Sequence, residues 1–411
     1  MTDTLEPAAL AAERKARLRR RRNNLLLVLP LLLFIAFSFV APISSMLYRS
    51  VYNPTLVELI PRTISALVEW RNDKTPPPHT LNTFSVELQQ LAQTRQSGRL
   101  AAAINRAQPG ASSLVNATAR QLRAVNPDTL ALDGARYLTQ ADPRWGDPAL
   151  WHAIKRLGAP YHVDNFLTAL DLERTTDGAI QARTSARIYL ALYAKTLGMA
   201  LVITLLCAAL GYPVAYYLAH APRRKAGVLL ALVLLPFWTS LLVRTTAWIA
   251  MLQTNGVVNA LLQAAGLIDQ PLEMLYTRFA TIIAMTHILL PFMILPLYSV
   301  MRGINPGYVR AALSLGSSPW SAFWRVYWPQ SVPGLTAGVL LVFIISVGYY
   351  ITPALVGGTD GQMISNLIAF HMQQSNNWGL AAALGALLLA LITVLYWLYD
   401  RLVGDRNMTL G

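Results

Sequence analysis

The chain of 411 residues is 54% hydrophobic and only 13% charged, whereas about a quarter of the residues in soluble domains are charged. This deficit excludes an ordinary soluble domain and indicates a membrane protein. The formal net charge of +14 does not call for nucleic acid, because basic residues beside apolar segments usually set the orientation of membrane helices. Cys207 is the only cysteine, which excludes an internal disulfide.

The first apolar segment, residues 24–47, follows a basic N-terminal stretch, residues 1–23, that contains Arg19 to Arg22. The apolar segment is longer than the core of a signal peptide, which has about 7–15 residues. We therefore expect an uncleaved first membrane helix that follows a cytoplasmic N-terminus.

Further apolar segments have about the 20 residues that a helix needs to cross the hydrocarbon core. Together with the first segment they predict an all-α membrane protein with six transmembrane helices. The five further segments are residues 196–218, 228–251, 279–301, 333–355 and 378–402, and a short tail, residues 404–411, follows the last one.

The positive charges alternate across the predicted membrane. Arg223 to Lys225 lie between the second and third segments, and residues 302–331, between the fourth and fifth, contain arginines but no acidic residue. The loops on the opposite side contain Asp269, Glu273 and Asp360. Because cytoplasmic loops carry the excess of Lys and Arg, both termini are expected in the cytoplasm.

A polar stretch, residues 48–190, separates the first two segments and is expected to lie outside the cytoplasm. It contains about 143 residues, too many for a simple connection. Apolar residues recur at helical spacing in residues 81–107, 117–125 and 151–157. We predict a mostly helical extracytoplasmic insertion between helices 1 and 2, and a transmembrane core at residues 191–403.

The cytoplasmic loop 302–331 has a helix–turn–helix pattern. Pro306 can start a helix, and Gly316 suits the left-handed residue that follows a helix end. Ser318 and Pro319 have the residue types preferred at an N-cap and at the first helical position. Pro329 and Pro333 are expected to end the second helix before the next membrane segment begins.

The same loop resembles the "EAA" loop of ABC importer permeases. The family pattern is Glu-Ala-Ala, three residues, Gly, nine residues, a hydrophobic residue, two residues and Pro. The matching positions are Ala311, Ala312, Gly316, Val326 and Pro329, and Pro319 lies within the pattern. Arg310 occupies the place of the usual Glu. The resemblance implies that the loop docks into a cleft on a separate ATP-hydrolysing subunit and transmits its closure to the membrane helices.

Three further motifs are similar to parts of the spermidine/putrescine permeases. Residues 236–245, 290–298 and 352–358 resemble the third, fourth and fifth helices of that family. The likeness covers about residues 196–402 and the first segment, but not the 48–190 insertion. It implies a permease of the bacterial inner membrane whose substrate is a polyamine or a related amino-cation.

The resemblance also implies the assembly around this chain. The expected partners are a second homologous permease subunit, two ATP-binding subunits, an extracytoplasmic solute-binding protein and the lipid bilayer. ATP and magnesium would bind the partner ATPase. The sequence has no Gly-x4-Gly-Lys-Ser/Thr phosphate-binding loop, no Cys/His cluster and no nucleophile–base pattern. We therefore expect no catalytic site, metal or cofactor in this chain.

A few side chains are candidates for a solute pathway. Arg244 lies inside a predicted membrane segment, so it either faces an aqueous path or extends to the outer interface. Trp238, Tyr349 and Tyr350 have aromatic faces that attract alkylammonium cations, although membrane aromatic residues are more often packing residues. Asp360 is expected at the outer side, near a cationic solute or the solute-delivering protein.

Two other classes of protein remain as alternatives to a permease. A membrane-anchored sensor would account for the outer insertion as a ligand sensor, but it would not explain five further membrane segments or the cytoplasmic loop. A secondary transporter would be expected to carry coupling carboxylates within its helices, and the predicted segments contain none apart from Asp400 at the end of the last one.

Overall fold

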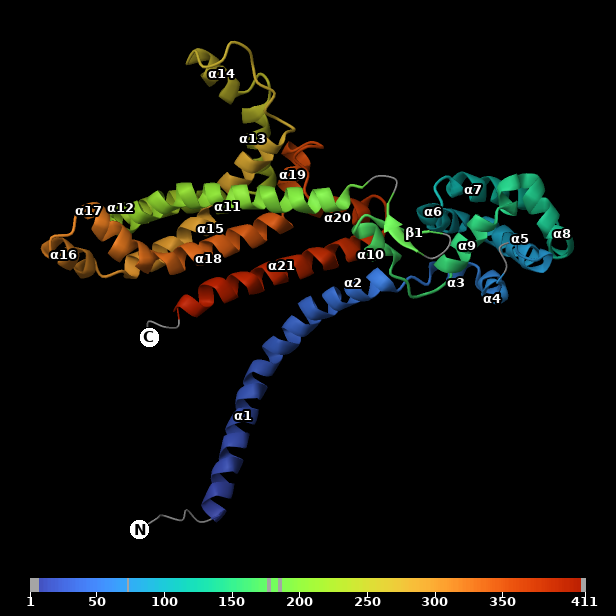
Figure 1. The fold of residues 1–411 in the computed structure, drawn as a ribbon, viewed down its shortest axis with the longest axis horizontal. Coiled ribbons are helices and arrows are strands. Elements are labelled where there is room, and N and C mark those ends of the chain that lie inside the picture. The colour runs from blue at the N-terminus through green and yellow to red at the C-terminus, as the bar shows by residue number, and fades with distance from the viewer. Residues whose placement is uncertain (1–6, 72–73, 176–178, 184–186, 408–411) are drawn as a thin grey trace. The chain divides into compact units, whose positions relative to one another are not determined.

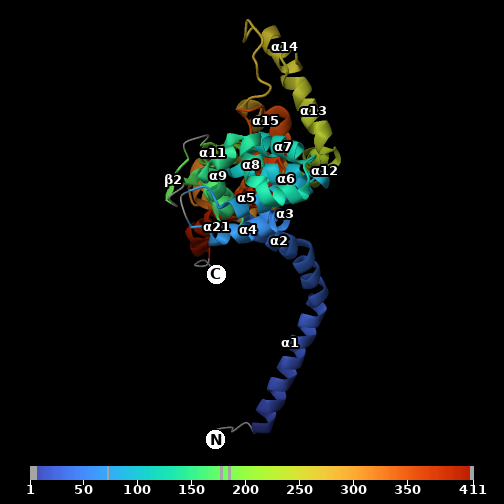
Figure 2. The same cartoon turned by 90° about the vertical axis from the view of Figure 1, so that its right-hand side faces the viewer.

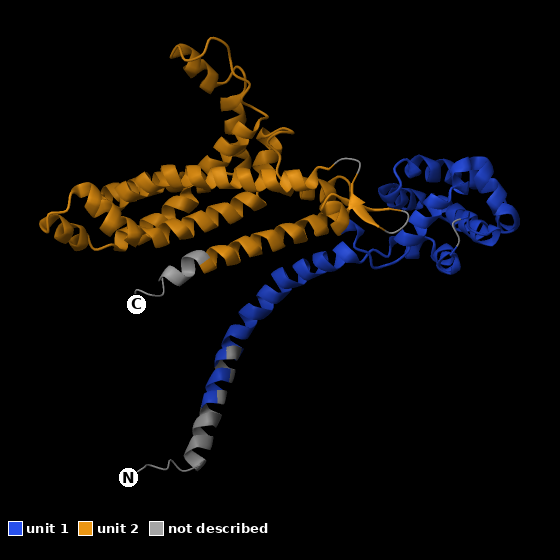
Figure 3. Cartoon of the chain, viewed as in Figure 1, with its two compact units in different colours: residues 1–165 blue, residues 166–411 orange. Residues whose placement is uncertain are grey.

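The computed structural model describes residues 7–71, 74–175, 179–183 and 187–407. The chain divides into two compact units, residues 1–165 and residues 166–411 (Figure 3). Helices make up nearly all of the regular structure in the described residues (Figure 1). This bears out the all-α class.

Unit 1 begins with the first predicted membrane helix. Helix α1 (Pro7–Ile35), a π-helical turn (Ala36–Val40) and α2 (Ala41–Val51) follow one another without a break. Residues 19–51 are long and apolar enough to cross a membrane, and none of their most apolar stretch is buried within the protein. This helix therefore presents its apolar side chains to lipid or to another protein.

Short helices fill the rest of unit 1. Four of these helices and one 3₁₀ turn have proline at the first helical position, where its missing N–H is not needed. Residues 81–107, expected as one helical stretch, form two helices separated by a turn in which Arg95 has a φ of +59°. The helices are α3 (Thr55–Leu59), α4 (Pro61–Glu69), α5 (Pro78–Gln93), α6 (Ser97–Ala107), α7 (Ala111–Leu122), α8 (Pro127–Ala141) and α9 (Pro148–Leu157), with a 3₁₀ turn, η2 (Pro143–Gly146).

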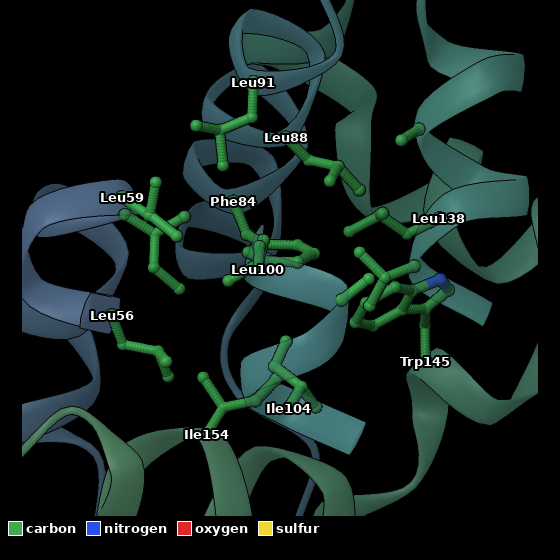
Figure 4. Close-up of a cluster of buried hydrophobic side chains, with 14 of the residues drawn as sticks. Leu56, Leu59, Phe84, Leu88, Leu91, Leu100, Ile104, Leu138, Trp145 and Ile154 are labelled. Carbon is green, nitrogen blue, oxygen red and sulfur yellow. The ribbon is translucent and has the colours of Figure 1, made fainter. Parts of the chain in front are cut away.

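Aromatic rings lie at the centre of the apolar core that α3–α9 enclose. The Phe84 ring centroid lies 5.0 Å from that of Trp145 and 5.2 Å from that of Trp151. The Trp145 indole donates a hydrogen bond of 2.9 Å to the Thr118 hydroxyl. Figure 4 shows Leu88 and other aliphatic side chains from several helices around Phe84 and Trp145. The insertion thus has a hydrophobic core of its own.

A buried carboxylate joins two helices of this core. Glu87 accepts hydrogen bonds from the backbone N–H groups of Arg62 and Thr63, at 2.9 and 3.0 Å, and from the Thr63 hydroxyl. These donors are at the N-terminus of α4, where the helix dipole favours a negative charge. Glu87 is therefore explained by its structural contacts.

Unit 2 begins at Phe166, within the short helix α10 (Asp164–Ala169). A two-stranded antiparallel sheet follows, formed by β1 (Leu172–Arg174) and β2 (Ile180–Ala182). The Asp171 carboxylate accepts backbone hydrogen bonds from Ile188, Tyr189 and Leu190 at 2.8–3.2 Å. It thereby caps α11 (Tyr189–His220). Because of such contacts, residues 166–190 belong to the compact unit of the transmembrane core, whereas we expected them in the insertion.

Three long helices pack side by side in unit 2. Helix α11, α15 (Arg278–Gly303) and α18 (Trp328–Gly348) contact one another (Figure 1). Near their ends, α20 (Ile364–Gln373) packs on α21 (Trp378–Asn407). A cluster of buried apolar side chains, including Ile288 and Met293 of α15, fills the space between the three helices.

The third predicted span is not one straight helix. It is broken into α12 (Arg223–Trp238) and α13 (Leu241–Leu252), with α14 (Val257–Ala264) beyond, and the break bends the chain by 95°. Figures 1 and 2 show α13 and α14 leading away from the long helices of unit 2. The expectation of a continuous helix at 228–251 was wrong because Ser240 starts a new helix, accepting a hydrogen bond of 3.2 Å from the Val243 N–H.

The described residues contain five helices that are long and apolar enough to span a membrane, or six with the bent pair taken as one span. The fifth span differs from the predicted 333–355. Its helix runs from Pro319 to Gly348, and Ile351–Val356 forms a separate short helix, α19. The chain turns there because side chains of α20 bind the freed carbonyls: Ser365 donates to Tyr349 O at 2.6 Å and Asn366 to Tyr350 O at 2.7 Å.

Candidate functional site: the coupling segment

The coupling segment, residues 302–331, starts with a well-capped helix. In α16 (Pro306–Ser314), the Asn305 side chain accepts a hydrogen bond of 2.8 Å from the Gly307 N–H, and Pro306 occupies the first helical position. The helix ends where Gly316 adopts a φ of +89° and the Ser317 N–H bonds to Ala312 O at 3.0 Å. The predicted helix start at Pro306 and left-handed glycine at 316 are both confirmed.

The second half of the segment is a helix that passes directly into the membrane bundle. Ser318 caps α17 (Pro319–Ala322) by accepting a hydrogen bond of 3.2 Å from the Ser321 N–H. The helix then widens into a π-helical turn, η3 (Phe323–Tyr327), and continues as α18. Ser318 and Pro319 therefore have their predicted places.

The expectation that Pro329 and Pro333 end this helix was wrong. A proline inside an α-helix lacks the N–H that would bond to the carbonyl four residues earlier. Just before Pro329 the π-helical turn shifts the pairing, so that the Trp328 N–H bonds to Phe323 O, and the Gln330 side chain donates to Val326 O at 2.7 Å. The coupling segment is thus continuous with α18, and residues 319–348 form one unbroken helix.

Aromatic side chains join the coupling segment to α11. The ring centroid of Tyr327 lies 5.2 Å from that of Tyr216 and 5.5 Å from that of His220. A hydrogen bond of 2.8 Å joins the Tyr212 and Ser331 hydroxyls. The sequence analysis missed these α11 residues, although Tyr212, Tyr216 and His220 recur every four residues and so share one helix face.

The outer surface of the coupling segment is apolar and exposed. Helix α16 has no buried residue, and the side chains of Tyr308, Leu315 and Trp320 are 57%, 88% and 72% exposed. Ala311 is exposed and Ala312 is partly buried. Several large apolar side chains exposed in one short segment are a feature of protein interfaces, and the small alanines permit a close approach.

Arg244 and Tyr349 lie in a polar region of unit 2. Arg244 is in the first turn of α13, close to Tyr349 and to His287 of α15. Among the described residues its buried Nε has no hydrogen-bond partner. Next to it, the Trp248 indole donates to His287 Nδ1 at 3.2 Å, a contact that the sequence analysis did not foresee.

The other candidate pathway residues have different surroundings. Trp238, at the end of α12, is 79% exposed, and Tyr350 is 38% exposed. The Asp360 carboxylate accepts a hydrogen bond of 2.7 Å from Arg278 Nε, and both side chains are more than half exposed. Lys195 donates to the Asp360 carbonyl at 2.9 Å. The expected outer acid is therefore engaged in an ion pair, and the described residues hold no group of three or more His, Cys, Asp or Glu suited to a metal.

Comparisons with known proteins identify the family of this chain. Residues 211–406 match the family described as "Binding-protein-dependent transport system inner membrane component". The chain is 35% identical over 228 residues to the spermidine/putrescine transport system permease protein PotB of Salmonella typhimurium strain SL1344, covering 55% of this chain and 79% of the relative. For PotB of Escherichia coli K12 the identity is 35% over 222 residues, covering 53% and 81% of the two chains.

Among solved structures, the chain is similar to a bacterial alginate ABC transporter crystallised with a periplasmic protein bound to an alginate pentasaccharide. The identity is 18% and the TM-score 0.46, with 55% of this chain and 81% of the other covered. The curated relatives establish the assignment. The chain belongs to the family of binding-protein-dependent transport system inner membrane components and is a permease subunit of an ABC importer.

Proposed function

We propose that this permease imports a polyamine, such as putrescine or spermidine, or a related amino-cation. The observation that carries the proposal is the 35% identity to spermidine/putrescine permeases over about four-fifths of their length. The aromatic side chains Trp238, Tyr349 and Tyr350 support it, because aromatic faces attract alkylammonium groups. Arg244 would then line the solute path, and Asp360 would lie near its outer opening.

The proposed assembly contains this chain, a second homologous permease, two ATP-binding subunits and an extracytoplasmic solute-binding protein. ATP and magnesium bind the ATP-binding subunits in this proposal. Residues 302–331, with Arg310, Ala311, Ala312, Gly316, Pro319, Val326 and Pro329, dock on one of those subunits. The exposed apolar side chains of α16 and α17 support this docking, and their continuity with α18 supplies a path for the motion.

The proposed topology places both termini in the cytoplasm and residues 48–190 outside it. The distribution of Lys and Arg between the loops supports this orientation. The insertion would then lie on the side from which the solute arrives. The family match covers residues 211–406, which a membrane-anchored sensor would not require. A permease therefore explains more of the sequence than a sensor does.

An uptake experiment tests the substrate. Cells that lack the gene are complemented with the wild-type chain, and uptake of labelled putrescine, spermidine and γ-aminobutyrate is measured with and without an excess of each unlabelled compound. We expect restored uptake of at least one polyamine, with competition among amines. Equal uptake of all three compounds in complemented and uncomplemented cells would contradict the proposed substrate class.

A further inference from the structure

A cavity lies at the junction of α11, α15 and the coupling segment. Its volume is about 490 Å³, and it is open to the surroundings on one side. Rings from α11 and from η3 form much of its wall, and two arginines, one in the last turn of α15 and one on α16, complete it. The residues that matter here are Tyr216, His220, Arg302, Arg310, Phe323 and Tyr327.

The two arginines of the cavity are not equivalent. Arg302 donates a hydrogen bond of 2.7 Å to Ala219 O, which fixes it to the end of α11. Arg310 is exposed, and no ion pair to it is found among the described residues. Residues 178–268 and 274–359 contain no Asp or Glu, so the elements that surround the cavity have no carboxylate of their own. The Arg310 guanidinium is therefore free to pair with a carboxylate that another chain supplies.

A second observation concerns the wall of the cavity. Tyr327 is only 4% exposed, and its hydroxyl has no hydrogen-bond partner within the described part of the chain. A buried hydroxyl without a partner is unfavourable, because it has lost its hydrogen bonds to water without gaining others. The cavity wall thus combines an exposed, unpaired guanidinium, which an incoming carboxylate can reach, with a buried hydroxyl that has no partner.

We propose that this cavity receives a carboxylate-bearing side chain of the ATP-hydrolysing partner and that Arg310 pairs with it. The usual family pattern has a glutamate at this position, whereas in the pairing proposed here the cation is on the permease and the anion on the partner. This inference rests on the proposed docking of the coupling segment. It defines the partner by its chemistry: an ATP-binding subunit with an acidic residue at the centre of its docking cleft.

The first test measures how much ATP-binding subunit co-purifies with the affinity-tagged chain from membranes in mild detergent. We expect Arg310→Glu to reduce the recovered subunit at least tenfold, because it places two carboxylates opposite each other, and Arg310→Lys to retain at least half. Arg224→Glu is the matched control, since Arg224 is an exposed cation outside the cavity on the same predicted side of the membrane. Wild-type recovery should also fall with rising salt.

The second test identifies the partner group directly. A water-soluble carbodiimide joins an amine to a carboxylate with no spacer, so the Arg310→Lys complex should give a cross-linked peptide between position 310 and one acidic residue of the ATP-binding subunit. Arg224→Lys should not give that peptide. Reversing the charge of the identified acid should restore recovery with Arg310→Glu.

The outcomes separate this inference from the proposed function. If the wild-type chain recovers no ATP-binding subunit, the proposed docking itself is contradicted. If the wild-type chain and Arg310→Glu recover it equally, or if position 310 cross-links to no partner carboxylate, docking stands and the reversed charge contact is overturned.

Discussion

The packing of α18 against α15 depends on Gly334, and replacing this glycine by alanine tests the account of the transmembrane bundle. A Cβ at position 334 would lie 2.9 Å from Val300 Cβ, 3.0 Å from Pro296 O and 3.1 Å from Leu297 Cα. All three atoms belong to the backbone or lie next to it, so no flexible side chain can move away. The helices would have to separate by a few tenths of an ångström, with a cost of about 1–3 kcal/mol that is typical of overpacking.

Two other glycines provide graded controls for Gly334→Ala. At Gly338 the nearest atom to an added Cβ would be Met293 Sδ at 2.7 Å, and a methionine side chain can adjust, so Gly338→Ala should be milder. Gly198 is an exposed residue of α11 with no atom within 4 Å of an added Cβ. Gly198→Ala should be neutral or stabilising by up to about 1 kcal/mol because alanine favours the helix.

The assay is the midpoint of thermal unfolding of the purified full-length chain in detergent. It is measured as the loss of monodisperse protein after heating. The expected order of midpoints is Gly334→Ala lowest, then Gly338→Ala, with Gly198→Ala at or above the wild type. Equal midpoints for Gly334→Ala and the wild type would refute the close packing of α15 and α18.

Three further changes test other parts of the structure. Trp145→Ala should destabilise the core of α3–α9 by about 3–5 kcal/mol, because the ring is fully buried; protease digestion should then cleave residues 54–157 at lower denaturant concentrations, and unchanged resistance would contradict that core. Gly316→Val should strain the left-handed turn by roughly 1–2 kcal/mol and lower uptake at an equal amount of chain in the membrane; wild-type uptake would show that the turn is not needed. Asp360→Asn should change the thermal midpoint little, since an exposed ion pair such as that with Arg278 contributes about 0–1 kcal/mol, and a large decrease would indicate that the pair is more important than its exposure suggests.

The apolar segments were predictable because crossing a membrane requires a long run of apolar residues, whatever the packing. The break between α12 and α13 was not, since the apolar pattern continues across Thr239 and Ser240 and masks the N-cap that Ser240 provides. The signal for the break was the pair of hydroxyl residues three and four positions after Pro236, within a segment that is otherwise apolar. Hydropathy therefore located the segment and local capping determined its shape.

The coupling segment was predicted well at its first helix and poorly at its second. Pro306 and Gly316 act through local backbone preferences, which a sequence reveals directly. Pro329 was expected to end a helix, but the π-helical turn before it accommodates the missing N–H. That turn packs Phe323 and Tyr327 against residues of α11 that lie more than a hundred positions earlier, and such tertiary contacts cannot be derived from local patterns.

The core of the insertion illustrates the same limit. Helical spacing revealed the helices of residues 81–107, but not that Phe84 packs against both Trp145 and Trp151. Sequence analysis identified Arg310 as a departure from the family pattern without assigning it a role. The cavity that Arg310 shares with Tyr327 became visible only once α11, α15 and the coupling segment were placed together.

The central claim is that residues 302–331 couple this permease to an ATP-hydrolysing partner. The most direct measurement is solute uptake by cells in which the order of residues 311–316 is reversed, at an amount of membrane-inserted chain equal to that of the wild type. The account predicts that uptake is lost while insertion is retained. Wild-type uptake in that variant would contradict the coupling role.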